Sequence, residues 1–135
     1  MGWLKPVLAG LEANKIVALA NKESLVAAGP LVTKTIESGR GTILPVDSEH
    51  SALFQALQGH HVSDIERIIL TASGGPFLGR TRAELVDITA AEAVRHPRWS
   101  MGPKISVDSA TMMNKALEVI EAYWLFNIEP NNIAV

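Results

Sequence analysis

The chain has 135 residues, of which 47% are hydrophobic, so it holds enough apolar material for the core of a globular domain. Its 12 basic and 14 acidic residues give a formal net charge of −2 and form no basic cluster, which argues against a nucleic-acid partner. The lack of cysteine excludes disulfides, thiolate metal sites and cysteine nucleophiles. No apolar run reaches the roughly 20 residues that cross a bilayer, so we expect a soluble protein without a membrane partner.

The first third of the sequence predicts alternating helices and strands. Apolar residues at helical spacing predict a helix over 4–11, and the run Ile16–Ala20 is typical of a buried parallel strand. A second helix is expected over Ser24–Glu37, with Gly39 as its stop, and a second strand over Thr42–Val46. This order is typical of a doubly wound parallel sheet.

Beyond residue 46 the pattern changes to short elements, and we place a domain boundary there. In chain order the sequence predicts a helix over 51–57, a strand over 65–71, helices that begin at Thr81–Glu84 and Thr89–Glu92, a loop over 97–105, a helix over 109–126 and a strand from Ile133. His96-Pro97 is expected to end the helix that begins at Thr89.

The last helix combines an apolar face with a polar patch. Its expected apolar face consists of Met112, Met113, Ala116, Leu117, Ile120 and Leu125. The polar patch contains Asn114, Lys115 and Glu118, which are neighbours on a helix. Glu118 can supply a metal ligand, and the other two can reach a phosphate or hydroxyl group. The alternative, favoured by spacing alone, is an ordinary surface ion pair between Lys115 and Glu118.

Two carboxylates follow the second predicted strand. If the chain stays extended, Asp47 and Glu49 project to the same side, where they repel unless a cation joins them. Carboxylate oxygens without thiolates favour a hard cation such as Mg²⁺ or Mn²⁺. The alternative is a solvated acidic turn, which spacing alone favours.

Two serines lie where an anion can bind. Ser73 precedes a Gly-Gly turn after a predicted strand, and Ser109 is placed near a predicted helix start. A plain turn and a plain helix cap are the commoner outcomes for such residues. His96, before a proline, is a helix-end cap or a ligand, and Trp99 with Met101 forms either a lid or a packed core.

Four sequence blocks, taken together, resemble the 1-deoxy-D-xylulose 5-phosphate reductoisomerase family. They are ANKESL at 20–25, LPVDSEH at 44–50, TASGGPF at 71–77, and HPRWSMG through DSATMMNK at 96–115. The resemblance implies an α/β chain whose residues 1–46 are the tail of a Rossmann-like NADPH-binding domain. Residues 47–135 would then be an α+β catalytic domain with a mixed sheet, incomplete at its C-terminal end.

The resemblance also implies roles for individual residues. Lys22, Glu49 and His96 match catalytic positions, and Asp47, Glu49 and Glu118 match metal ligands. The implied substrate contacts are Lys22, Ser48, Glu49, Ser73, His96, Ser109, Asn114, Lys115 and Glu118. Asn21, Glu23 and Gly102 match positions on the NADPH side, and Trp99 with Met101 matches the flap.

The implied enzyme uses NADPH and Mg²⁺ or Mn²⁺, with Co²⁺ as a third option, to rearrange and reduce a sugar phosphate. The resemblance implies that the full-length enzyme is a homodimer. Its implied location is the bacterial cytoplasm, and a plastid is the alternative. We expect this chain to be a fragment that is inactive by itself. Ala116 departs from the family, where glycine is expected. The alternatives are a metal-dependent sugar-phosphate module without redox activity and a purely structural α/β domain.

Overall fold

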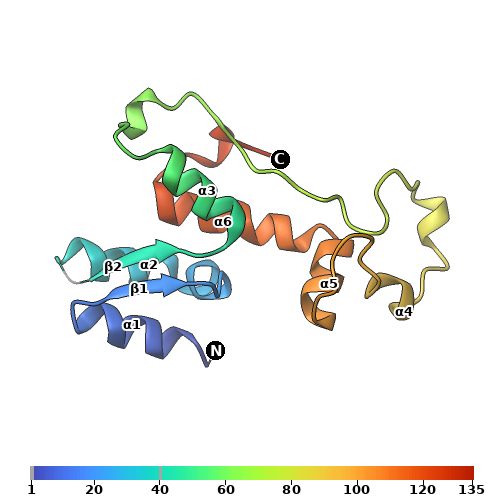
Figure 1. The fold of residues 1–135 in the computed structure, drawn as a ribbon, viewed down its shortest axis with the longest axis horizontal. Coiled ribbons are helices and arrows are strands. Elements are labelled where there is room, and N and C mark those ends of the chain that lie inside the picture. Colours follow the sequence, from blue (N-terminus) through green and yellow to red (C-terminus); the bar gives the residue numbers. More distant parts are fainter. Residues whose placement is uncertain (1, 40) are drawn as a thin grey trace. The chain divides into compact units, whose positions relative to one another are not determined.

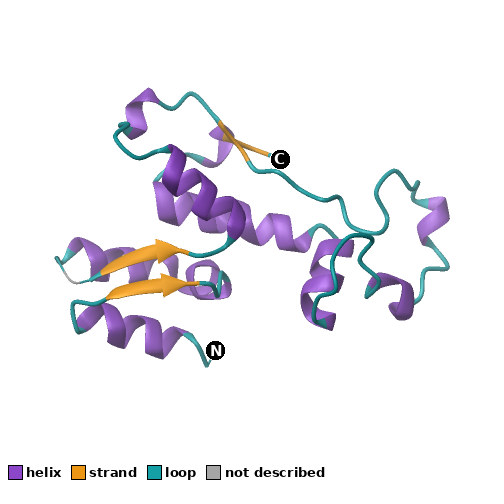
Figure 2. Ribbon diagram, in the orientation of Figure 1, coloured by secondary structure: helices purple, strands orange, loops and turns teal. Residues whose placement is uncertain are grey.

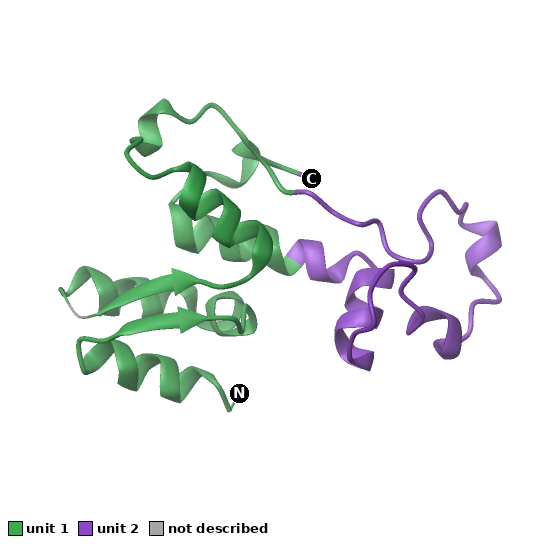
Figure 3. Ribbon diagram, viewed as in Figure 1, with its two compact units in different colours: residues 1–70, 117–134 green, residues 71–116, 135 purple. Residues whose placement is uncertain are grey.

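The computed structural model describes residues 2–39 and 41–135, and its helices and strands are drawn in Figures 1 and 2. The chain divides into two compact units, which Figure 3 colours separately. Unit 1 comprises residues 1–70 and 117–134, and unit 2 comprises residues 71–116 with Val135. The domain boundary at residues 46 and 47 stays a prediction.

The start of unit 1 alternates helices and strands, as the hydrophobic pattern predicts. Its elements are α1 (Leu4–Glu12), β1 (Ile16–Leu19), α2 (Glu23–Glu37), β2 (Thr42–Pro45) and α3 (Ser48–Ala56). β1 and β2 pair in parallel, with Ile16 opposite Thr42 and Leu19 opposite Pro45. Gly39 follows α2 with φ of 77°, a conformation that glycine adopts without steric cost, so the predicted stop is confirmed.

Only one face of the β1–β2 pair is buried. Leu19 and Ile43 lie in a core cluster with Leu11 and Leu25, whereas Ile16 is 75% exposed. Successive side chains of a strand point to opposite faces, so the helices cover one face of this pair. The parallel strand predicted at Ile16–Ala20 is therefore confirmed over Ile16–Leu19, but its predicted burial is confirmed only for one face.

A second core cluster lies between α6 (Met113–Phe126) and a short parallel pair of strands, β3 (Ile68–Ile69) and β4 (Ile133–Ala134). It contains Ile68, Leu70, Ala122 and Ile128. The strand at Ile133 is confirmed, but the strand predicted over 65–71 is reduced to two residues. Within the described residues β3 pairs only with β4, so the mixed sheet stays a prediction.

Helix α2 is kinked where it meets α6. Ala28 has non-helical φ and ψ of −145° and 30°, and Pro30 follows inside the helix. Gly29 is buried beside Trp124, and a Cβ atom at Gly29 would lie 2.2 Å from the indole ring. The missing side chain therefore lets the Trp124 ring pack directly on the backbone of α2.

Unit 2 has little regular structure and, among the residues described here, contributes no hydrophobic side chain to either core cluster. Its first predicted helix, from Thr81, is only a 3-10 turn at Ala83–Leu85, although the Thr81 backbone still donates to Glu84. The capping box of Thr89 and Glu92 is confirmed. It starts α4 (Ala90–Ala93), which ends before the predicted stop at His96-Pro97.

The helix predicted over 109–126 is divided into two. α5 (Pro103–Ala110) begins at a proline, which is favoured in the first turn of a helix, so the loop expected over 97–105 is shorter. Met112 has φ of 60°, a left-handed conformation that interrupts a right-handed helix. α6 starts at the next residue.

In the described part of the chain, no helix is long and apolar enough to cross a membrane.

Candidate active site

Three carboxylates of unit 1 converge at the carboxyl end of β2. Asp47 and Glu49 come from the start of α3, and Glu118 comes from α6. One oxygen atom from each lies within 4.8 Å of the others. The extended conformation expected after Val46 is wrong, because α3 begins at Ser48 rather than Ser51. Asp47 is the N-cap of α3 and Glu49 is in its first turn, so the start of a helix, and not an extended strand, brings the two side chains together.

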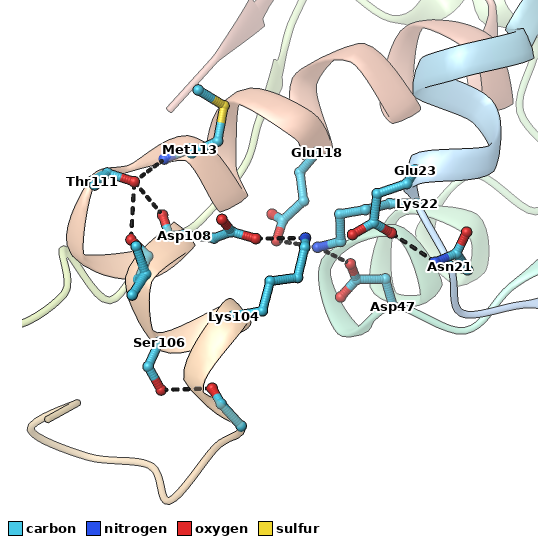
Figure 4. A network of polar contacts seen from close by, with 12 residues as sticks. Asn21, Lys22, Glu23, Asp47, Lys104, Ser106, Asp108, Thr111, Met113 and Glu118 are labelled. Carbon is cyan, nitrogen blue, oxygen red and sulfur yellow. Dashed lines mark hydrogen bonds and ion pairs between the residues drawn. The ribbon is translucent and has the colours of Figure 1, made fainter. Parts of the chain in front are cut away.

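Lys22 joins two of these carboxylates. It precedes α2 and is only 8% exposed. Its ammonium nitrogen lies 2.9 Å from Glu118 and also pairs with Asp47 (Figure 4). Burial by itself lowers the pKa of Lys22, but hydrogen bonds and charge attraction from Asp47 and Glu118 outweigh it, so the pKa is raised. The ammonium group is therefore a resident cation between the two acids.

The donor set of Asp47, Glu49 and Glu118 fits a hard divalent cation. Mg²⁺ binds oxygen ligands at about 2.1 Å, which places neighbouring ligand oxygens roughly 3–4 Å apart. The oxygen atoms of the three carboxylates lie within 4.8 Å of one another, and two of the three residues already pair with the Lys22 cation. These three residues can therefore hold the ion.

A second group of possible ligands lies beside the first. Asp47, His50 and Glu121 also present atoms within 4.8 Å of one another. His50 Nε2 already faces the Glu118 carbonyl oxygen at 2.9 Å. Burial, followed by the Asp47 charge, raises the pKa of Glu121 to about 8, so this carboxyl tends to keep its proton. The first set, rich in charged oxygen atoms, is the better cation site.

The buried face of α6 carries charged side chains as well as apolar ones. Lys115, Glu118, Glu121 and Ala122 are buried, whereas Met112, Met113, Ala116 and Ile120 of the expected apolar face are exposed. Leu117 is half-buried and Leu125 packs against a core cluster, so the prediction is confirmed at those two positions and wrong at the other four. The assumption that charged side chains of a helix stay exposed fails here, because charges such as that of Glu118 are neutralised by partners such as Lys22. These ion pairs offset the free-energy cost of burial. Ala116 is exposed.

Within unit 2, His96 contacts both Ser73 and the loop that follows His96 in the chain. His96 Nδ1 accepts hydrogen bonds from the backbone N–H groups of Arg98 (3.2 Å) and Trp99 (3.0 Å). An accepting Nδ1 leaves the proton of the neutral ring on Nε2, which lies 3.0 Å from Ser73 Oγ. Ser73 Oγ also accepts from the Gly75 N–H, so neither of these two contacts uses its own proton.

The structure places Ser109 differently from the sequence prediction. Ser109 lies in the last turn of α5, so the expectation that it uses a helix start to bind an anion is wrong. It nevertheless lies beside the Ser73 turn. A Cβ atom at Gly75 would be 2.6 Å from the Ser109 carbonyl oxygen, and Gly75 has φ of 68°. A glycine is therefore required for this approach.

The remaining predicted residues occupy several places. Asn114 is half-buried and Lys115 is 6% exposed at the start of α6. Trp99 is 63% exposed on the loop before α5, Met101 is half-buried, and Gly102 is at the N-cap of α5. Other polar contacts are Asn21 Nδ2 to Glu23 at 2.8 Å, at the start of α2 (Figure 4), and Ser48 Oγ to Glu49 at 2.5 Å.

Sequence reasoning missed His50 and Glu121. Both are essentially inaccessible, with 0% and 1% of their surfaces exposed. A signal was present, because Glu121 lies three residues after Glu118 on the same side of a helix and His50 is adjacent to Glu49.

A pocket within unit 2 lacks this chemistry. It has a volume of about 680 Å³, and the described residues that line it, which include Phe77, Leu78, Ile88 and Met112, have no ionisable side chain.

Comparison with known proteins gives matches over nearly the whole chain. The profile of the 1-deoxy-D-xylulose 5-phosphate reductoisomerase C-terminal domain matches residues 43–126, and that of 1-deoxy-D-xylulose 5-phosphate reductoisomerase matches residues 1–29. The reductoisomerases of Chlorobium chlorochromatii and Clostridium beijerinckii are each 57% identical over 132 residues, or 98% of this chain. The chain spans only 35% and 34% of their lengths.

Solved structures give the same picture. A crystal structure of DOX-P reductoisomerase in complex with NADPH, fosmidomycin and magnesium matches with a TM-score of 0.88 and 51% identity. The match covers 98% of this chain and 35% of that one. The Zymomonas mobilis reductoisomerase in complex with NADPH matches with a TM-score of 0.86 and 51% identity, over 96% of this chain and 33% of that one.

Proposed function

Because the chain belongs to the 1-deoxy-D-xylulose 5-phosphate reductoisomerase family, we propose that it forms the cation- and phosphate-binding part of such an enzyme. The reaction would convert 1-deoxy-D-xylulose 5-phosphate into 2-C-methyl-D-erythritol 4-phosphate with NADPH. The observation that carries this proposal is the convergence of Asp47, Glu49 and Glu118, two of which pair with the Lys22 ammonium group. Related structures that contain NADPH and magnesium support the same cofactors for this chain.

Asp47, Glu49 and Glu118 would hold the divalent cation. When bound, Mg²⁺ or Mn²⁺ supplies Lewis-acid polarisation of the substrate oxygens next to it. Lys22 neutralises Asp47 and Glu118 before the cation arrives, and its ammonium group is then available to donate to a substrate oxygen. Ser48, whose hydroxyl donates to Glu49, helps to orient that carboxylate.

The phosphate of the substrate would be bound by unit 2. Ser73 is prepared for this role, since its hydroxyl oxygen accepts from His96 and Gly75 and its proton remains to donate. Ser109, Asn114 and Lys115 supply a further hydroxyl, an amide and a positive charge. His96 acts here by orienting Ser73, because Nδ1 is already occupied by two backbone N–H groups.

Other residues would contribute to cofactor binding and closure. Asn21, Glu23 and Gly102 are proposed on the NADPH side, and Trp99 with Met101 would close over the substrate and exclude water. A homodimer of the whole enzyme is part of the same proposal.

A segment exchange tests the proposed activity. The 132-residue segment of the Chlorobium chlorochromatii enzyme that matches this chain would be replaced by the corresponding residues of this chain. We expect NADPH consumption that requires both 1-deoxy-D-xylulose 5-phosphate and Mn²⁺. Asp47→Asn in the exchanged segment should lower kcat/KM by at least about a hundredfold, since Lewis-acid stabilisation amounts to several kcal/mol.

Two controls make the result specific. Glu37→Gln changes an exposed carboxylate at the end of α2 and should leave kcat/KM unchanged. A hybrid that binds Mn²⁺ and sugar phosphate but consumes no NADPH would instead support a binding module without redox activity. NADPH consumption that survives Asp47→Asn would refute the assigned cation site.

A further inference from the structure

A buried chain of polar contacts lies behind the three carboxylates. A Glu121 carboxyl oxygen is 3.2 Å from His50 Nδ1, and His50 Nε2 is 2.9 Å from the backbone carbonyl oxygen of Glu118. All three side chains are buried, with 0% of His50 and 1% of Glu118 and Glu121 exposed. The His50 ring also stacks on Phe126, with ring centroids 6.2 Å apart and an angle of 13° between the planes. The ring is therefore fixed on several sides.

The acceptors around His50 determine how many protons the pair holds. The Glu118 carbonyl can only accept, so Nε2 must carry a proton. In the described part of the chain, His50 Nδ1 and Glu121 Oε2 are buried 3.2 Å apart, and neither has a hydrogen-bond partner. One further proton between these two atoms satisfies both of them. The His50–Glu121 pair then holds two protons and carries no net charge.

This chain of contacts connects the two elements that supply the carboxylates. His50 lies in the first turn of α3, directly after Glu49, and Glu121 lies one turn beyond Glu118 on α6. A shift of the His50 ring would therefore change the distance between the start of α3 and the backbone of Glu118. Because a cation requires its ligands at fixed separations, such a shift would be felt as a loss of affinity.

We propose that Glu121 is a positioning residue for the divalent cation: its carboxyl group holds His50, which in turn fixes the backbone of Glu118 against α3. The inference rests on the proposed cation site formed by Asp47, Glu49 and Glu118. Glu121 acts without touching the ion, and it does so as a neutral hydrogen-bonding group. An additional negative ligand beside the site would increase the repulsion that Lys22 already has to offset.

The proposal separates two properties of Glu121, its hydrogen bond and its charge. Glu121→Gln removes the ionisable group but keeps an N–H donor for His50 Nδ1. Glu121→Met keeps a similar unbranched side chain and removes the hydrogen bond, and its flexible side chain limits the loss of packing. Glu37→Met, at an exposed position on α2, is the matched control.

The experiment is a Mn²⁺ titration of each variant of the chain, followed by electron paramagnetic resonance of the free ion. We expect Glu121→Gln to bind Mn²⁺ within about threefold of the unsubstituted chain, and Glu121→Met to bind at least about tenfold more weakly, as for other outer-shell partners of metal ligands. Glu37→Met should have no effect. Equal binding by Glu121→Met, or a loss in Glu121→Gln as large as in Glu121→Met, would overturn the proposal.

Asp47→Asn, measured in parallel, separates this inference from the cation site itself. If the unsubstituted chain binds Mn²⁺ and Asp47→Asn does not, the site is sound and the Glu121 variants decide the positioning role. If Asp47→Asn binds as well as the unsubstituted chain, both the site and the inference are refuted. Should Glu121→Met fail to fold, Glu121→Gln still decides, because a loss of Mn²⁺ affinity in this folded isostere overturns the proposal and retention supports it.

Discussion

The Lys22 ammonium nitrogen lies 2.9 Å from a Glu118 carboxylate oxygen, and the same ammonium group pairs with Asp47. The lysine therefore occupies the position of a cation between two of the three carboxylates that are proposed to bind Mg²⁺ or Mn²⁺. Lys22 and the ion neutralise the same charge. This competition gives the first prediction.

Lys22→Met should destabilise the metal-free chain and increase its response to Mn²⁺. Without the ammonium group, Asp47 and Glu118 repel each other, and we expect the free energy of unfolding to fall by roughly 2–4 kcal/mol. The side chain of Asp47 is 18% exposed, which keeps the effect below that of a fully buried pair. Thermal unfolding with and without Mn²⁺ measures both quantities. A smaller Mn²⁺-induced rise in Tm than in the unsubstituted chain would count against the competition.

Glu121 predicts a pH dependence of stability. Its pKa is raised from 4.5 in the unfolded chain to about 8 in the folded one, so the folded state binds more protons in this range. The contribution of Glu121 to the free energy of unfolding is therefore fully present below pH 4.5 and is lost as the pH rises through about 8. The loss amounts to at most about 1.4 kcal/mol per pH unit. Metal-free urea unfolding at several pH values, compared with Glu121→Gln, isolates this contribution.

His50 also contributes to the pH dependence of stability. Burial lowers the pKa of His50, which adds stability above 6.5 that is lost as the pH falls, opposite in sign to Glu121. His50 is still present in Glu121→Gln, so the difference between the two proteins reports mainly on Glu121. An unchanged difference in unfolding free energy from 4.5 to 8 would contradict the raised pKa.

The His96 ring should control the loop that carries Trp99. His96→Ala removes the acceptor for the backbone N–H groups of Arg98 and Trp99, whereas the side-chain oxygen of His96→Asn can still accept them. We expect trypsin to cleave after the exposed Arg98 severalfold faster in His96→Ala and at nearly the unsubstituted rate in His96→Asn. Equal cleavage rates in all three proteins would show that the ring does not hold the loop.

Gly75 and Gly79 form a matched pair. Both have positive φ, 68° and 82°, but only a Cβ atom at Gly75 would contact the Ser109 backbone. Gly79→Ala should therefore cost about 1–2 kcal/mol from its backbone conformation alone. Gly75→Ala should cost roughly a further 1–3 kcal/mol from the collision. Hydrogen exchange of the amides in 71–116 measures the two losses, and equal losses would contradict the close approach to Ser109.

The alternating start of unit 1 could be predicted from sequence because its signals are local. Helical spacing in 4–11, the apolar run at 16–20 and the glycine after α2 each act within a few residues. The start of α3 could not be predicted in this way. Asp47 and Glu49 appear as an acidic turn in isolation, and they become one cluster only when Glu118, some seventy residues later, folds against them.

The buried face of α6 is predicted only in part, because hydrophobic periodicity assumes that charges avoid the interior. Lys115, Glu118 and Glu121 are buried on this helix, while Met113 and Ile120 are 50% and 40% exposed. The burial of Glu118 depends on Lys22, and that of Glu121 on His50, and both partners come from other elements. Such compensation is a tertiary property that no pattern within one helix contains.

The convergence of Asp47, Glu49 and Glu118 on a divalent cation is tested most directly by thermal unfolding of the chain with and without Mn²⁺. A ligand that binds only the folded state must stabilise it, by about 2.7 kcal/mol at a hundred times its Kd. We predict a concentration-dependent rise in Tm that is absent when Asp47→Asn and Glu118→Gln are combined. No rise in the unsubstituted chain, or an equal rise in the double variant, would contradict the assigned cation site.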